Sequence, residues 1–182
     1  MFAKNQDDGL VRAVTSVVGN EAEQEGFFRQ MQKKRPSSQP FLTTATQDFA
    51  FTAVQDFIIE GSCPNIGTIP LKRFKPLTVE TKTFPPENQN IKFSFDMKDV
   101  GIYDTNDMRL TYLNGQNQPI VRKFENIKMD DRKIFFEAPF PHDDFLMNGL
   151  TIAAVTMGAD EFADADKMAE AAVFGPGLIE VD

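Results

Sequence analysis

Hydrophobic residues recur at helical spacing in the first part of the chain. Between about residues 8 and 34 they lie on one face of an α-helix, at Leu10, Val14, Val17, Val18, Phe28 and Met31. Acidic residues at positions 7 and 8 and the basic run 33–35 suit the two ends of the helix dipole. Pro36 cannot continue the helix, so we expect one long helix that ends before it.

A second helix is predicted after the loop "RPSSQP". Thr43 or Thr44 is its candidate N-cap, and Gly61 is its candidate C-terminal stop. Its buried side would carry Phe49, Ala53, Val54, Phe57 and Ile58. Two antiparallel helices joined by a short polar loop form a helical hairpin, which alone has too little apolar partner surface to be stable.

The hydrophobic spacing changes to two residues in the second half of the chain. Residues 63–86 are rich in proline and predict an irregular linker that lies along the surface. In "NIKFSFDM" (90–97) apolar Ile91, Phe93 and Phe95 alternate with polar residues, which indicates a half-buried strand. Further strands are predicted in 108–124, on both sides of Asn114-Gly115, and in 132–138, 150–157 and 177–181.

Together these patterns predict an α+β protein. The helical hairpin would occupy residues 1–62, the proline-rich linker 63–86, and an antiparallel β-sandwich-like domain 87–182. The acidic stretch 158–177 is either a long loop or a loop that bears a short helix.

Composition and charge exclude several partners. The net charge is −8 at pH 7, whereas nucleic acid and anionic membrane surfaces attract basic patches. No run of about 18 apolar residues is present, so we expect no transmembrane helix. The first ten residues lack the pattern of a signal peptide. Of the aromatic residues, 18 are Phe and none is Trp, which favours core packing over ligand recognition.

The single cysteine and the single histidine limit the chemistry further. One cysteine excludes an intrachain disulfide framework, and one histidine excludes a multi-histidine metal site within the chain. Cys63 is either a small, partly buried residue at a helix end or an interchain disulfide partner in an oxidising compartment. A catalytic role for His142 would need Asp143 or Asp144 and a nucleophile such as Ser62, Ser94 or Cys63. Nothing in the sequence brings these together, and we interpret His142 as a loop residue.

Three motifs follow one another in the first half of the chain: "GNEAEQEGFFRQM" (19–31), "FLTTATQDFAFTAVQDFIIEGSCPN" (41–65) and "LKRFKPLTV" (71–79). In this arrangement the sequence resembles the second half of the ferritin-like domain of fungal and bacterial proteins related to sexual development, stress and desiccation. The ending "VFGPGLIEVD" is similar to the final strand of that family. The resemblance implies that the hairpin is half of a ferritin-like bundle, whose other half is missing, removed or supplied by another chain. It also favours an oxidising, vacuolar or secretory compartment.

The resemblance directs attention to Glu21, Gln24 and Glu25. A ferritin-like di-iron centre takes a Glu from each of two helices and a Glu-x-x-His from each of the other two. Here Gln24 stands in the histidine position after Glu21, and an amide oxygen is a poor substitute for imidazole toward iron or zinc. Glu21 and Glu25 could still hold a hard cation with carboxylates of another helix. The second helix offers Asp48, Asp56 and Glu60.

We therefore interpret Glu21, Gln24 and Glu25 as remnants of a degenerate metal site. No cofactor and no enzymatic activity are expected. The leading hypothesis is a structural or storage-type protein that binds itself, forming a homo-oligomer or a large ordered assembly linked by Cys63 disulfides. One alternative is a ferritin-like protein that completes a carboxylate metal site between chains. The other is an extracellular module whose β-domain binds a ligand.

Overall fold

The computed structural model describes residues 8–101, 104–130 and 132–181. Its first part is helical, with a long α1 (Asp8–Met31), a short α2 (Gln47–Val54) and the 3₁₀ turns η1 (Gln55–Phe57) and η2 (Ile66–Thr68). The later part contains the strands β1 (Thr78–Val79), β2 (Gln89–Asp96), β3 (Met108–Asn114), β4 (Ile120–Arg122), β5 (Glu125–Asp130), β6 (Lys133–Phe140), β7 (Gly149–Met157) and β8 (Ala172–Val181). Between them lie η3 (Met97–Asp99), η4 (Thr105–Asp107), α3 (His142–Phe145) and α4 (Ala165–Ala171).

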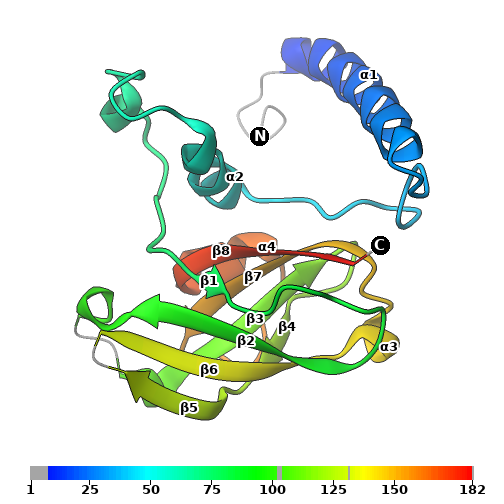
Figure 1. The fold of residues 1–182 in the computed structure, drawn as a ribbon. Helices are drawn as coiled ribbons and strands as arrows, with labels where there is room; N and C mark the ends of the chain where they lie inside the picture. The colour runs from blue at the N-terminus through cyan, green and yellow to red at the C-terminus, as the bar shows by residue number, and fades with distance from the viewer. Residues whose placement is uncertain (1–7, 102–103, 131, 182) are drawn as a thin grey trace.

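The strands form two antiparallel four-stranded sheets, one with the order β1-β2-β6-β5 and the other with the order β4-β3-β7-β8 (Figure 1). The two sheets pack face to face because apolar residues alternate with polar ones along the strands. In β2 this alternation places Ile91, Phe93 and Phe95 on the face that meets the other sheet. Phe93 lies opposite Phe136 in the register of β2 with β6. The predicted β-sandwich-like arrangement of antiparallel strands is confirmed.

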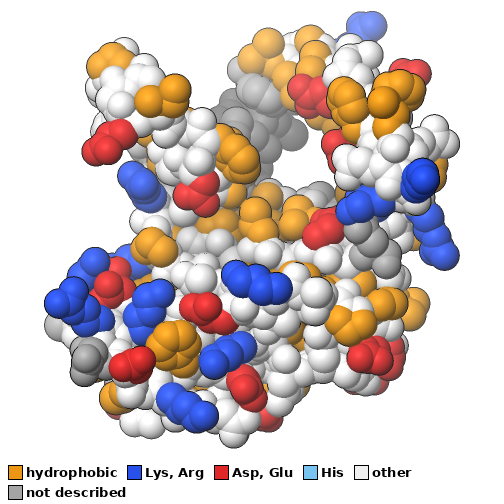
Figure 2. Space-filling model, in the orientation of Figure 1, with side chains coloured by type: hydrophobic (Ala, Val, Ile, Leu, Met, Phe, Trp, Pro, Cys, Tyr) orange, Lys and Arg blue, Asp and Glu red, His pale blue; other side chains and the backbone are white. Residues whose placement is uncertain are grey.

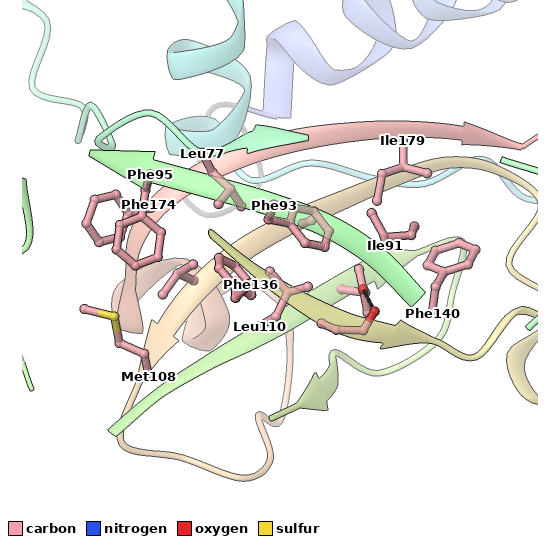
Figure 3. Packing of buried hydrophobic residues seen from close by; sticks show 14 of the residues in the cluster. Leu77, Ile91, Phe93, Phe95, Met108, Leu110, Phe136, Phe140, Phe174 and Ile179 are labelled. Carbon is pink, nitrogen blue, oxygen red and sulfur yellow. Dashed lines mark hydrogen bonds between the residues drawn. The ribbon is translucent and has the colours of Figure 1, made fainter. Parts of the chain in front are cut away.

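Aromatic rings fill the space between the two sheets (Figure 3). Phe95 stacks on Phe174 of the opposite sheet with ring centroids 4.3 Å apart. Phe93 stacks on Phe136 at 5.4 Å. Pairs of this kind contribute about 0.5–1.5 kcal/mol each beyond the area that they bury. None of the side chains in this core comes from α1, so the sandwich closes its interior without the long helix.

Two short helices cover the outer face of the β4-β3-β7-β8 sheet. Phe49 of α2 stacks near Phe74 at 4.9 Å, and both pack with Met168 of α4 against residues of β3 and β7. Thr46 caps α2 by accepting a hydrogen bond from the Phe49 amide at 3.3 Å. Asp164 caps α4 in the same way, through the Lys167 amide at 2.8 Å. A second, smaller hydrophobic cluster therefore lies on the outside of this sheet.

The predicted hairpin of two long helices is wrong. α1 has 24 residues, but α2 has only eight and begins at Gln47. The expected cap, Thr43, instead has its hydroxyl bonded to the sandwich, accepting from the Gly115 amide at 2.6 Å and donating to the Leu150 carbonyl at 2.5 Å. This contact keeps the chain extended until Thr46, so the second helix starts late.

The proline-rich segment 63–86, predicted as a surface linker, takes part in the sandwich. Phe74 and Leu77 are buried in the two hydrophobic clusters. The Lys75 amide donates to the Val173 carbonyl at 3.3 Å, and the Gly175 amide donates to the Lys75 carbonyl at 2.8 Å. β1 then pairs with β2. The chain is thus tied to the sandwich before the period-two pattern begins.

Candidate functional site

Seven residues of α1 follow one another at alternating spacings of four and three. These residues, which we call the α1 seam, are Leu10, Val14, Val17, Glu21, Gln24, Phe28 and Met31. Such spacing places side chains in one line along a helix, as in helices that pack along a partner. The five apolar members are between 38 % and 68 % exposed. The seam is therefore a packing surface that the described part of the chain leaves open to solvent.

Glu21 and Gln24 lie at the middle of the α1 seam, and Glu25 lies beside it. All three side chains are exposed. The Gln24 amide donates to the Asn20 side chain at 2.9 Å, one turn back on the same helix. The structure thus brings the three predicted residues to one region of α1, between an apolar N-terminal stretch and an apolar C-terminal stretch.

The carboxylates of the second helix do not join Glu21 and Glu25 within one chain. Figure 1 shows α2 standing apart from α1. The Asp48 carboxylate accepts a hydrogen bond from the Lys72 amide at 3.0 Å, which ties it to the segment after α2. Among the described residues, no group of three or more His, Cys, Asp or Glu is placed so that it could hold a metal ion.

α1 contacts the sandwich only near its C-terminal end, as far as the described contacts show. Arg29 pairs with Glu180 of β8 at 3.1 Å and donates to the Arg35 carbonyl at 2.9 Å. Gly26 lies against Pro36: a Cβ atom added to Gly26 would be 3.7 Å from the Pro36 carbonyl oxygen. Because 100° separates successive residues of a helix, Gly26 and Arg29 point well to one side of the seam. The attachment therefore leaves the seam accessible.

The segment between α1 and α2 forms a groove of about 470 Å³ with the last turns of α1. Glu25, Arg29, Leu42 and Thr43 are among the residues that line it. Thr43, which sequence reasoning interpreted as a helix cap, fastens this segment to the β3–β4 turn and to β7. No feature of the sequence near Thr43 indicates that contact, because its partners lie more than 70 residues away.

Apolar side chains are also exposed around α2. Phe57 is 86 % exposed and Ile59 is 79 % exposed, although Phe57 was predicted to lie on the buried side of the second helix. α2 contributes Phe49 to the outer hydrophobic cluster, whereas Phe57 belongs to η1, after α2 has ended at Val54. Of the twenty large hydrophobic residues that are exposed in the described chain, fourteen precede residue 70. Figure 2 shows these side chains gathered over the helical part of the molecule.

Cys63 lies in the loop that follows this apolar region. Its thiol is free and the residue is half-buried. As the only cysteine, it makes no disulfide within the chain. Its neighbours in sequence include the exposed Ile59, so the cysteine lies close to the apolar helical surface rather than to the sandwich core.

His142 belongs to a structural network at one end of the sandwich. It is buried at the start of α3. One ring nitrogen lies 3.0 Å from the Asp143 carboxylate, and the other lies 3.2 Å from the Asn148 side-chain oxygen. Ser94 is engaged elsewhere, donating to Glu80 at 2.6 Å. The structure therefore does not bring His142 to that candidate nucleophile, and it corrects the loop assignment to a short helix.

A groove of about 600 Å³ lies between α2, the segment before β1, and β8. Its lining includes the charged residues Asp56, Arg73 and Lys75 and one aromatic residue, Phe74, which is buried. No histidine, cysteine or serine lines it. Within the described part of the chain, the groove thus offers neither an exposed aromatic platform nor a pairing of histidine with a nucleophile.

Among the described helices, none is both long enough and apolar enough to cross a membrane. No protein-family model matches the chain, and no curated protein matches it.

Proposed function

We propose that this chain is a non-enzymatic structural or storage-type protein that self-associates through its N-terminal helical region. The observation that carries the proposal is the α1 seam, whose apolar side chains are exposed along the length of the helix. Soluble monomers rarely leave a contiguous apolar surface of this kind open, and such surfaces mark sites of protein association. The sandwich has a closed core of its own and leaves the seam as the chief unsatisfied packing surface.

The energies are consistent with association between copies. Full burial of a Val, Leu, Phe or Met side chain stabilises by about 1.5–3 kcal/mol. Bringing two molecules together costs about 4–15 kcal/mol in lost freedom of motion. Five half-exposed apolar residues on one helix offer about 4–8 kcal/mol, and the same five on each of two helices offer about 8–15 kcal/mol, which is of the same size as that cost. A second copy is thus the simplest source of enough apolar surface.

Cys63 supplies a means of locking such an assembly. A free, half-buried thiol in a loop next to an exposed apolar surface is well placed to meet another copy. In an oxidising compartment two such thiols form an interchain disulfide. The proposal extends to a large ordered assembly if the α1 seam and Cys63 join different pairs of copies.

We also propose, from the sequence motifs in 19–31, 41–65 and 71–79, that the chain is related to the ferritin-like proteins of development, stress and desiccation. In that setting α1 would be one helix of a bundle completed between molecules, and Glu21, Gln24 and Glu25 would be a degenerate remnant. An intermolecular metal site is the competing reading of the same residues.

The test is the native mass of the purified full chain, measured by sedimentation with and without reductant, together with elemental analysis. We expect a metal-free protein that is a small oligomer in the presence of reductant. Without reductant, disulfides should join these oligomers into larger assemblies. The Cys63→Ser variant should behave in both conditions as the wild type does in reductant. A monomer in all conditions would refute the proposal, and stoichiometric iron or manganese would replace it with the metal-binding alternative.

A further inference from the structure

We infer that α1 pairs with α1 of a second copy in antiparallel orientation, in the one register that sets Glu21 of each copy against Gln24 of the other. This inference rests on the proposed function and specifies its interface. It follows from the order of polar and apolar residues along the α1 seam and from the accessibility of that seam.

The α1 seam has the same polarity when it is read from either end. From Val14 to Met31 it contains two apolar residues, then Glu21 and Gln24, then two apolar residues. When two copies run antiparallel and residues whose numbers add up to 45 face each other, Val14 meets Met31 and Val17 meets Phe28. Glu21 then meets Gln24 twice, once on each side of the two-fold axis. Every layer is therefore matched in polarity.

Other arrangements of the same two helices lose this match. A shift of one heptad sets Glu21 against Val17 or against Met31, which would place a charged group on an apolar side chain. A parallel pair sets Glu21 against Glu21, and two carboxylates at one site repel each other. In the antiparallel register the Gln24 amide instead donates to the Glu21 carboxylate of the other copy, a charge-assisted hydrogen bond. Single polar layers in helical pairs are known to set register in this way, with some loss of stability.

A second copy fits the seam better than any described part of the same chain. α1 is 24 residues long, which corresponds to roughly 36 Å at 1.5 Å per residue. α2 has only eight residues, and its one buried aromatic residue, Phe49, packs against the sandwich. Arg29 fixes α1 to β8 from another side of the helix. A helix of equal length is needed to cover the seam, and α1 of another copy provides it.

Cross-linking between engineered cysteines tests the register. In a Cys63→Ser background, we would prepare Val14→Cys and Met31→Cys as full-length chains, one with a longer tag, and oxidise them with copper phenanthroline. Both positions are exposed, so neither substitution removes core packing. The mixture should give a cross-linked band of mixed size, and neither variant alone should give a cross-linked dimer. Val17→Cys mixed with Phe28→Cys should repeat this result independently.

The outcomes separate this inference from the proposed function. Cross-linking of Val14→Cys or Met31→Cys alone would show a parallel pair and overturn the inference. Absence of any cross-link in a sample whose mass is oligomeric would overturn it too, while leaving self-association intact. A Cys63→Ser chain that is monomeric by sedimentation would refute the proposed function itself, and the inference with it.

Discussion

Tyr112 lies inside the sandwich, with its hydroxyl 3.5 Å from the Ala138 carbonyl oxygen. Burial raises the pKa of Tyr112 well above its ordinary value of 10.0, because the phenolate would lose its hydration, and the nearby Arg122 opposes this shift only in part. In the unfolded chain Tyr112 loses its proton near pH 10, whereas in the folded chain it does so only at a higher pH. The stability that this residue contributes is therefore complete below about pH 10 and is lost as the pH rises beyond it.

We predict a steeper alkaline loss of stability in the wild type than in Tyr112→Phe. The free energy of unfolding, measured with denaturant at several values from pH 8 upward, should fall by up to about 1.4 kcal/mol per pH unit more in the wild type once Tyr112 titrates in the unfolded state. Surface lysines titrate in both proteins and cancel in the comparison. Equal slopes for the two proteins would show that the buried hydroxyl does not control alkaline stability.

Lys72 stabilises the C-terminal end of α4. Its ammonium group lies 2.6 Å from the Ala172 carbonyl oxygen and 3.4 Å from those of Ala169 and Glu170. It also lies 4.7 Å from the centre of the Phe74 ring. Desolvation lowers the pKa of Lys72, while the Asp48 carboxylate partly restores it. A cation at this place compensates the free carbonyl groups at a helix end.

Replacing Lys72 by Met should keep the apolar stem and remove the charge. We predict a loss of about 0.3–1 kcal/mol in the free energy of unfolding, the range for an exposed cation at a helix C-terminus. Lys82→Met, at an exposed position, is the matched control and should be close to neutral. Equal stability of the two variants would mean that the contacts between Lys72 and α4 contribute nothing measurable.

At the scale of elements, the strands that can be predicted from the sequence are those whose apolar residues are buried in the sandwich. β6, and β2 over part of its length, alternate because one face of their sheet is exposed, whereas β3 and β7 are buried on both faces and are rich in apolar residues. Both patterns can be recognised in the sequence. β5 could not, because it is exposed along its whole length and owes its structure to pairing with β6 at the edge of a sheet. Its bulge, with Asn126 at a φ of 49°, interrupts the register further.

The helical region shows the opposite limitation. α1 is predicted because its apolar residues recur at helical spacing, yet that spacing does not say whether the partner belongs to the same chain. The second helix was overestimated because Thr43 looks like a cap and is bonded instead to the distant Gly115 and Leu150. The sequence indicates Glu21 and Gln24 as a metal-site remnant, whereas in the structure they are the two polar members of the α1 seam.

A prediction at this scale concerns the two polar layers of the α1 seam. Replacing Glu21 and Gln24 together by Leu makes the seam apolar throughout, so association should tighten by about tenfold or more, equal to 1.4 kcal/mol. The register should become less specific at the same time, and Val14→Cys alone should then cross-link. Glu23→Leu, on the opposite side of α1, is the control for added hydrophobicity. Unchanged affinity in the double variant would show that these residues are outside the interface.

In the molecule as a whole, apolar residues lie in two kinds of place, the buried clusters of the sandwich and the exposed surface of the helical region. The sandwich buries its aromatic residues in a closed core, and its outer sheet is covered by α2 and α4. α1 is attached to this body through Arg29, and the apolar residues of its seam are exposed. The long surface that this arrangement leaves exposed is suited to another helix. That division is the physical basis of the self-association that we propose.

The most direct test of this account compares two variants in sedimentation experiments under reducing conditions. Val17→Glu places a charge on the α1 seam, whereas Ser16→Glu places the same charge one residue earlier, about 100° around the helix and off the seam. The account predicts that the wild type and Ser16→Glu sediment as the same oligomer and that Val17→Glu is monomeric. A Val17→Glu protein that keeps the wild-type mass would contradict the account, because the apolar face of α1 would then not hold the copies together.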